Sequence, residues 1–166
     1  MEPQAREIIP SVIERHSLMV YRLAYVRAGT RHDADDIYQE VFLRYISASP
    51  TFTCPEHEKA WFIRVTVNVS RNLLKSAWRK RTVLLTEEVG YMEDLFSLSA
   101  NGLKEALAAL PEKSRTVIHL YYFENMTAEE IGGALHLTAP AVRMMLSRAR
   151  KKLKATLNGE EACAHA

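Results

Sequence analysis

Residues 127–153 constrain the fold of this chain most, because they predict two short helices joined by a tight turn. Thr127 can accept a hydrogen bond from the Glu130 amide while the Glu130 carboxylate accepts one from the Thr127 amide, which starts the first helix. The segment 135–137 forms the turn. Thr138 then follows as the N-cap candidate of the second helix.

In the second helix of this pair, one stripe is apolar and the positive charges lie on the rest of the surface. Its apolar stripe repeats at intervals of four, three and four residues: Val142, Leu146, Ala149 and Leu153. Its other sides are basic or polar: Arg143, Ser147, Arg148, Arg150, Lys151, Lys152 and Lys154. This arrangement is typical of a helix-turn-helix whose second helix lies in a DNA major groove. A solvated basic helix within a bundle is the alternative.

The first helix of the pair contains two adjacent glycines, Gly132 and Gly133. Glycine lowers helix stability, so its presence here needs a compensating reason. Since neither residue has side-chain bulk, we expect a neighbouring helix to approach closely at this pair.

The overall composition excludes several classes of protein. The 166 residues allow one ordinary domain or two small ones. No apolar run has the length of a membrane span and no signal peptide is evident, so we expect a cytoplasmic protein. Cys54 and Cys163 are isolated, which argues against a metal site or a disulfide scaffold. No phosphate loop, nucleophile elbow or HExxH motif occurs, so we expect no enzyme activity, no catalytic residue, no metal and no cofactor.

The charges are unevenly distributed although the net charge is only +2. Basic residues concentrate within 64–81 and 143–154, and acids within 33–40 and 87–94. Two separated basic blocks indicate two nucleic-acid contacts, whereas the acidic segments indicate a partner of another kind. Asp33, Asp35 and Asp36 could hold a metal, but a helix start attracts carboxylates without one.

Helical spacing recurs along the chain and no strand alternation is evident, so we predict an all-α fold. The predicted organisation is two small helical domains, 1–81 and 103–157, joined by a flexible acidic linker, 82–102. The C-terminal domain is the helix-turn-helix, and residues 158–166 form a disordered tail.

One helix of the first domain, beginning near Glu58, carries a polar stripe opposite its apolar residues. The stripe recurs at intervals of four, three, four and four residues: Arg64, Asn68, Arg71, Lys75 and Arg79. The segment 68–72 is rich in residues that bond their own backbone, which predicts a break with a small polar pocket. Trp78 lies among cations and could stack on bases. A core position is its alternative.

These segments together resemble the bacterial sigma factors of RNA polymerase, in their extracytoplasmic-function (ECF) class. The segment 33–46, DADDIYQEVFLRYI, resembles the part that grips the clamp helices of the polymerase. The segment 60–81, AWFIRVTVNVSRNLLKSAWRKR, resembles the part that melts and reads the minus-ten element. The segment 103–153 is similar to the domain that reads the minus-thirty-five element.

The resemblance implies a transcription initiation factor and assigns residues to three contacts. The core-polymerase contact comprises Asp36, Gln39, Glu40 and Arg44. The minus-ten contact comprises Asn68, Ser70, Arg71, Asn72, Lys75, Trp78 and Arg79, with 68–72 as a loop that holds a flipped base. The minus-thirty-five contact comprises Thr138, Arg143, Met144, Ser147 and Arg148. The implied partners are core RNA polymerase (clamp helices and flap), promoter DNA and an anti-sigma factor, without membrane insertion.

Four positions depart from the family pattern. Asn72 stands where many members carry Asp, which would change base choice in the pocket. Met144 and Met145 occupy positions that are often polar or basic, and Met cannot make bidentate contacts to bases. Readout would then rely on the remaining polar residues or on DNA shape. His136 occupies a turn position where Gly is common.

Two other functions remain open on the sequence alone. A stand-alone helix-turn-helix regulator would use residues 1–81 for sensing or dimerisation, and would bind a palindromic site as a dimer. A helical adaptor would bind polymerase without reading DNA. Charge reversal at Arg143 and Arg148 distinguishes an adaptor from a protein that reads DNA, because an adaptor would keep its function.

Overall fold

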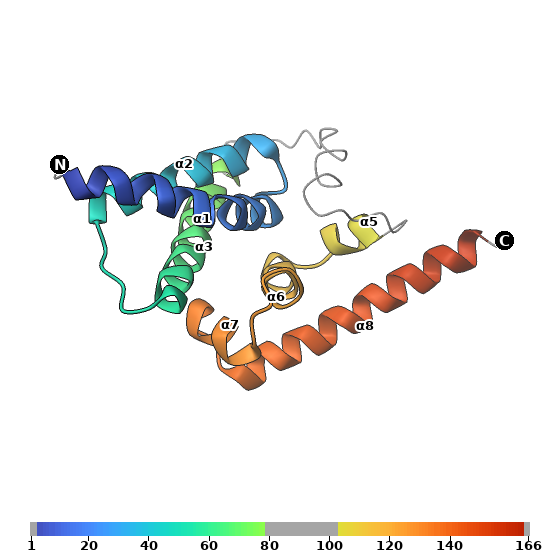
Figure 1. Cartoon of the computed structure of the whole chain (residues 1–166). Coiled ribbons are helices and arrows are strands. Elements are labelled where there is room, and N and C mark those ends of the chain that lie inside the picture. The colour runs from blue at the N-terminus through green and yellow to red at the C-terminus, as the bar shows by residue number, and fades with distance from the viewer. Residues whose placement is uncertain (1–2, 79–102, 165–166) are drawn as a thin grey trace. The chain divides into compact units, whose positions relative to one another are not determined.

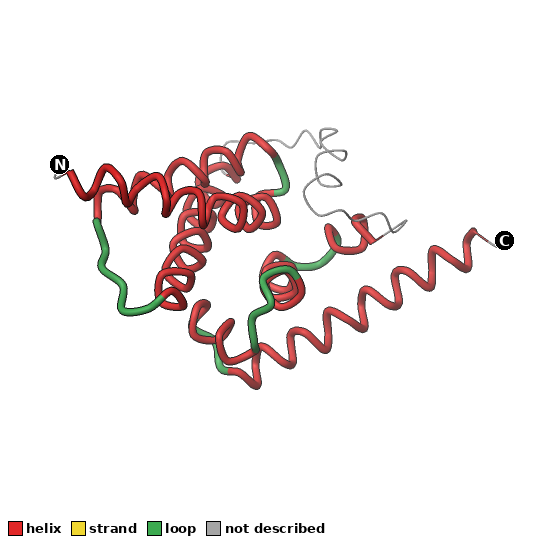
Figure 2. Tube along the Cα trace, viewed as in Figure 1, coloured by secondary structure: helices red, strands yellow, loops and turns green. Residues whose placement is uncertain are grey.

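The computed structural model describes residues 3–78 and 103–164, and the predicted linker 82–102 lies outside these ranges. Every regular element within the described ranges is an α-helix, which confirms the all-α prediction (Figure 1, Figure 2). The chain divides into a first unit, Met1–Val83, and a second unit, Leu84–Ala166. Among the described helices, none is long and apolar enough to span a membrane.

The first unit consists of α1 (Pro3–Ala28), α2 (Arg31–Ala48) and α3 (Pro55–Trp78), and each helix packs against the other two. Gly29 has a positive φ of 77°, which permits the tight turn between α1 and α2. The Thr30 hydroxyl then accepts a hydrogen bond from the Asp33 amide at 3.2 Å and caps α2.

Phe62 on α3 lies at the centre of an aromatic cluster that joins all three helices. Its ring centroid is 4.5 Å from that of His16 on α1, and 5.5 Å and 5.3 Å from those of Phe42 and Tyr45 on α2. His16 Nε2 also lies 2.6 Å from a Glu58 carboxylate oxygen on α3. His16 is therefore a packed, hydrogen-bonded histidine of the core.

Helix α3 is continuous through 68–72, so the predicted break at this segment is wrong. Two side chains do bond the backbone here. The Thr66 hydroxyl donates to the Phe62 carbonyl at 2.6 Å and the Ser70 hydroxyl to the Val67 carbonyl at 2.9 Å. Both bonds run back along the helix without interrupting it. Burial of Val67 and Val69 across this segment stabilises the helix more than local turn preference opposes it.

The second unit consists of α5 (Leu103–Ala108), α6 (Glu112–Tyr122), α7 (Ala128–Leu135) and α8 (Ala139–Ala164). Helices α5, α6 and α7 all pack against α8. Both predicted N-caps are confirmed. Thr127 and Glu130 form the reciprocal capping box of α7, at 3.2 Å and 2.7 Å, and the Thr138 hydroxyl accepts from the Ala141 amide at 3.2 Å.

The turn between α7 and α8 depends on a close backbone approach. His136 adopts the left-handed conformation, with φ 57°, and the Leu137 amide donates to the Gly132 carbonyl at 2.9 Å. A Cβ at Gly132 would lie 2.5 Å from the Leu137 carbonyl oxygen, whereas a Cβ at Gly133 would meet nothing within 4 Å. Only Gly132 is therefore needed for close packing. The group that approaches it is the backbone of the turn, and not a neighbouring helix as the sequence predicted.

Helix α8 continues to Ala164, so the prediction of a disordered tail over 158–166 is wrong for residues 158–164. Gly159 does not end the helix. The residues that follow it include Ala and Glu, which have high helix propensity.

The glycine pair allows a matched test of the turn. Gly132→Ala should lower the free energy of unfolding of the second unit by about 1–3 kcal/mol, because the turn backbone must move to admit the methyl group. Gly133→Ala should raise it by about 0.5–1 kcal/mol through helix propensity alone. Hydrogen exchange at the α7 and α8 amides measures both effects. Equal effects of the two variants would show that the Leu137 carbonyl does not restrict the size of the side chain at position 132.

Candidate nucleic-acid interface

Helix α8 separates buried apolar residues from an exposed face. Val142, Leu146 and Ala149 are buried against the rest of the second unit. The opposite side exposes a set that we call the α8 outer face: Met144, Ser147, Arg148 and Lys151. Three of the residues predicted for the minus-thirty-five contact thus lie together on one exposed surface. Thr138, the cap of this helix, is also exposed.

Two arginines of α8 contact neighbouring helices instead of projecting freely. Arg143 pairs with Glu129 on α7, which links the two helices of the helix-turn-helix. The Arg150 Nε donates to the Tyr122 hydroxyl at 2.7 Å, and its guanidinium lies 5.3 Å from the Tyr121 ring centroid. The hydrogen bond to Tyr122 raises the pKa of Arg150. Both contacts lie at the surface of the unit and add to the apolar packing of α8.

Helix α3 exposes a second polar surface, which we call the α3 polar face: Asn68, Arg71, Asn72 and Lys75. Their spacing of three, one and three residues places all four on one side of the helix. The side chains of Trp78 and Arg79, also predicted for this contact, lie outside the described residues.

Ser70 cannot take part in this surface, so its predicted DNA contact is wrong. Its relative exposure is 0%, because it lies on the side of α3 that faces α1. There its hydroxyl accepts a hydrogen bond from Nε of Arg27, which is itself buried. Sequence reasoning missed Arg27. A signal was available, because this arginine follows the buried Leu23 by one helical turn.

Trp61 continues the α3 polar face toward the start of the helix. It precedes Asn68 by seven residues and is partly exposed. Its ring packs edge-on at 5.9 Å from Tyr45 and 6.0 Å from Phe52, which belongs to the loop between α2 and α3. The surface therefore combines polar groups with the accessible side of an aromatic ring.

Helix α2 presents its predicted polymerase-binding residues away from the core. Glu40 and Arg44 form an i,i+4 pair at 2.7 Å, and Asp36 and Gln39 are exposed. The same side carries two exposed apolar residues that sequence reasoning missed, Leu43 (58%) and Ile46 (38%). We call this set the α2 outer face: Asp36, Gln39, Glu40, Leu43, Arg44 and Ile46.

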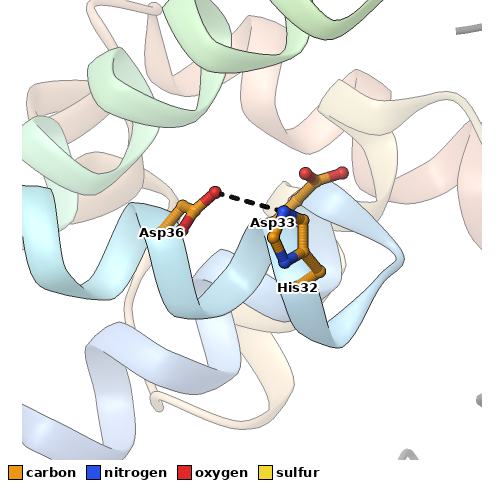
Figure 3. A group of neighbouring side chains, drawn as sticks. All are labelled: His32, Asp33 and Asp36. Carbon is orange, nitrogen blue, oxygen red and sulfur yellow. Dashed lines mark ion pairs between the residues drawn. The ribbon is translucent and has the colours of Figure 1, made fainter.

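Three potential metal ligands gather at the start of α2: His32, Asp33 and Asp36 (Figure 3). Their ligand atoms lie within 4.8 Å of one another. His32 Nε2 and an Asp36 carboxylate oxygen are 3.6 Å apart as an exposed i,i+4 pair. Asp33 lies in the first turn, where the helix dipole stabilises a carboxylate. The helix dipole is sufficient to explain why acidic residues lie at this helix start, so the group does not support the proposal of a metal site.

Two family models match the chain, in the order in which its units occur. Sigma-70 region 2 matches residues 12–80, and Sigma-70, region 4 matches residues 101–153. The first match covers most of α1 and all of α2 and α3, which carry the α2 outer face and the α3 polar face. The second covers the helix-turn-helix.

Curated relatives extend this likeness over most of the chain. The ECF RNA polymerase sigma factor SigE of Mycolicibacterium smegmatis is 30% identical over 152 residues, which cover 86% of this chain and 59% of that protein. The RNA polymerase sigma factor SigV of Bacillus subtilis is 29% identical over 160 residues, which cover 94% of this chain and 95% of that protein. The chain therefore spans little more than half of the first relative and nearly all of the second.

Solved structures share the fold. CnrH in complex with the cytosolic domain of CnrY aligns with a TM-score of 0.67 at 23% identity, over 93% of this chain and 90% of that one. The sigma factor RpoE in complex with the anti-sigma factor NepR from Bartonella quintana aligns with a TM-score of 0.70 at 17% identity, over 95% of this chain and 98% of that one.

The Arg27–Ser70 hydrogen bond behind the α3 polar face can be tested directly. Ser70→Ala should lower the free energy of unfolding of the first unit by about 1–3 kcal/mol, because a buried charged donor loses an acceptor. Asn68→Ala, on the exposed side of the same helix, should change it by less than about 0.5 kcal/mol. Hydrogen exchange at the α1 and α3 amides reports both values. A Ser70→Ala effect as small as that of Asn68→Ala would contradict the structural role.

Proposed function

This chain belongs to the sigma-70 family of RNA polymerase sigma factors, in its ECF class, and on this basis we propose that it binds core RNA polymerase and directs it to specific promoters. The observation that carries the proposal is the pairing of two units, matched in order by region 2 and region 4, that each expose a polar helix face. The proposed role is that of a cytoplasmic initiation factor without catalytic activity of its own.

The minus-thirty-five contact is proposed for the α8 outer face. Residues near the start of a recognition helix contact base edges, while basic residues contact phosphates. Ser147 and Arg148 suit base or phosphate contacts. Arg143 pairs with Glu129 at the exposed surface, and its guanidinium has further N–H donors for a base or a phosphate.

The minus-ten contact is proposed for the α3 polar face together with Trp61. Unstacking a base from the duplex costs a few kcal/mol, and an aromatic ring can offset part of that cost by stacking. The partly exposed Trp61 supplies such a ring beside Arg64. Because α3 is continuous over 68–72, the base would lie against the side of the helix and not within a loop of those residues.

The polymerase contact is proposed for the α2 outer face. Leu43 and Ile46 form an apolar centre, and the charged residues Asp36, Glu40 and Arg44 lie on the same side of α2. Protein interfaces commonly combine an apolar core with a polar rim.

Control by an anti-sigma factor is also proposed. Two proteins of this fold were solved in complexes, CnrH with the cytosolic domain of CnrY and RpoE with the anti-sigma factor NepR. Affinity purification from the native host should recover such a protein together with the polymerase subunits. Recovery of polymerase alone would count against this part of the proposal.

Run-off transcription tests the proposed function. Purified core RNA polymerase is mixed with this protein on a promoter fragment from upstream of its own gene. Initiation at a defined site only when the protein is present would support the proposal. Absence of initiation, together with absence of co-elution with core polymerase, would refute it. A dimer that binds duplex DNA without polymerase would favour a stand-alone regulator.

The apolar centre of the α2 outer face should contribute strongly to polymerase binding. Leu43→Asp should weaken the affinity for core polymerase at least ten-fold, because it places a charge where an apolar contact forms. Leu18→Asp is the matched control, since Leu18 on α1 is similarly exposed (54%) but lies outside that face. Fluorescence anisotropy with labelled protein measures both affinities. Similar losses in the two variants would exclude a specific role for Leu43.

Charge reversal on the α8 outer face separates a sigma factor from an adaptor. Arg148→Glu should reduce initiation at the promoter at least ten-fold, because it opposes the negative potential of DNA. Co-elution with core polymerase should be unchanged, since Arg148 lies in the other unit from the α2 outer face. Undiminished initiation by this variant would support the adaptor.

A further inference from the structure

Met144 is an exposed apolar side chain on an otherwise polar and basic face. Its relative exposure is 53%, whereas that of Val142, Leu146 and Ala149 on the same helix does not exceed 3%. A single exposed apolar residue is common on protein surfaces. Its position among the residues proposed to contact bases is what sets it apart.

Met144 lies in the second turn of α8, which begins at Ala139. The N-terminal residues of a recognition helix are those that contact base edges. Its neighbours on the outer face, Ser147, Arg148 and Lys151, are exposed as well, and Met144 itself is 53% exposed. The adjacent Arg143 is paired with Glu129. Met144 therefore lies on the same exposed surface as the polar residues that would contact DNA.

The chemistry of Met limits what it can recognise there. The thioether has no donor and is only a weak acceptor, so it cannot satisfy the polar edges of guanine, adenine or cytosine. In the major groove, thymine alone adds an apolar group, its C5 methyl. Contact between the flexible thioether side chain and that methyl group removes apolar surface from water on both sides.

We propose that Met144 determines specificity at the minus-thirty-five element by packing against a thymine C5 methyl group in the major groove. The inference rests on the proposed function, since it requires α8 to lie in promoter DNA. It assigns a selective role to a residue that makes no hydrogen bond to a base. Met144 favours thymine over cytosine at its position because the methyl group is absent from cytosine.

The test removes single methyl groups from DNA. Holoenzyme reconstituted from this protein and core polymerase enriches promoter sequences from a randomised duplex pool. Each thymine in the enriched upstream element is then replaced, one at a time, by deoxyuridine, which lacks only the methyl group. Equilibrium binding should weaken roughly four-fold at one or two positions, the factor expected for burial of one methyl group.

Protein variants link that effect to Met144. Met144→Ala should bind the thymine duplex about four-fold more weakly and should no longer distinguish thymine from deoxyuridine at the same position. Met144→Leu keeps an apolar side chain and should retain the discrimination. Arg148→Ala is the control, since it should weaken binding to both duplexes equally.

The outcomes separate this inference from the proposed function. If the holoenzyme enriches a defined element but no thymine responds to Met144→Ala, the inference is overturned and the proposed function stands. If Met144→Ala alters only the binding of a protein partner, Met144 belongs to a protein interface and the inference is again overturned. If the holoenzyme enriches no element, both fail together.

Discussion

The structure depends on the fact that each helix can bury only one side, so the choice of the buried stripe determines every surface that remains outside. On α2, burial of Ile37 and Val41 leaves the polar and apolar residues of the α2 outer face exposed. On α8, burial of Val142 and Leu146 exposes Met144 in the same way. The hydrophobic cores thus position the proposed contacts with polymerase and DNA without contributing residues to them.

Polar contacts between helices then divide the basic residues by role. Arg27 bonds to Ser70 behind the α3 polar face, and Arg150 bonds to Tyr122 beside α8. Charged donors held in this way stabilise helix positions more than they attract a ligand. Arg71 and Arg148 are exposed, which leaves them available for phosphates and bases. Net charge alone would not have separated these two groups.

Exposed apolar side chains supply the other part of the surface chemistry. Leu43 and Ile46 lie within charged surroundings on α2, and Met144 lies within basic surroundings on α8. A mixed surface of this kind combines electrostatic attraction with contacts that depend on shape. In the proposed sigma factor, the first pair would contact polymerase and Met144 would contact DNA.

The sequence by itself determined the all-α class, the capping box at Thr127 and the apolar stripe of α8, because these depend on residues within one or two helical turns. It also identified the exposed sides of α2, α3 and α8. Only the tertiary structure decided that α3 continues through 68–72, that Ser70 is buried and that Gly132 alone meets the Leu137 carbonyl. The first two depend on burial against neighbouring helices, which outweighs local conformational preferences of a few tenths of a kcal/mol per residue. The third depends on the close approach of the turn backbone, which brings together groups that the helix pattern alone does not place.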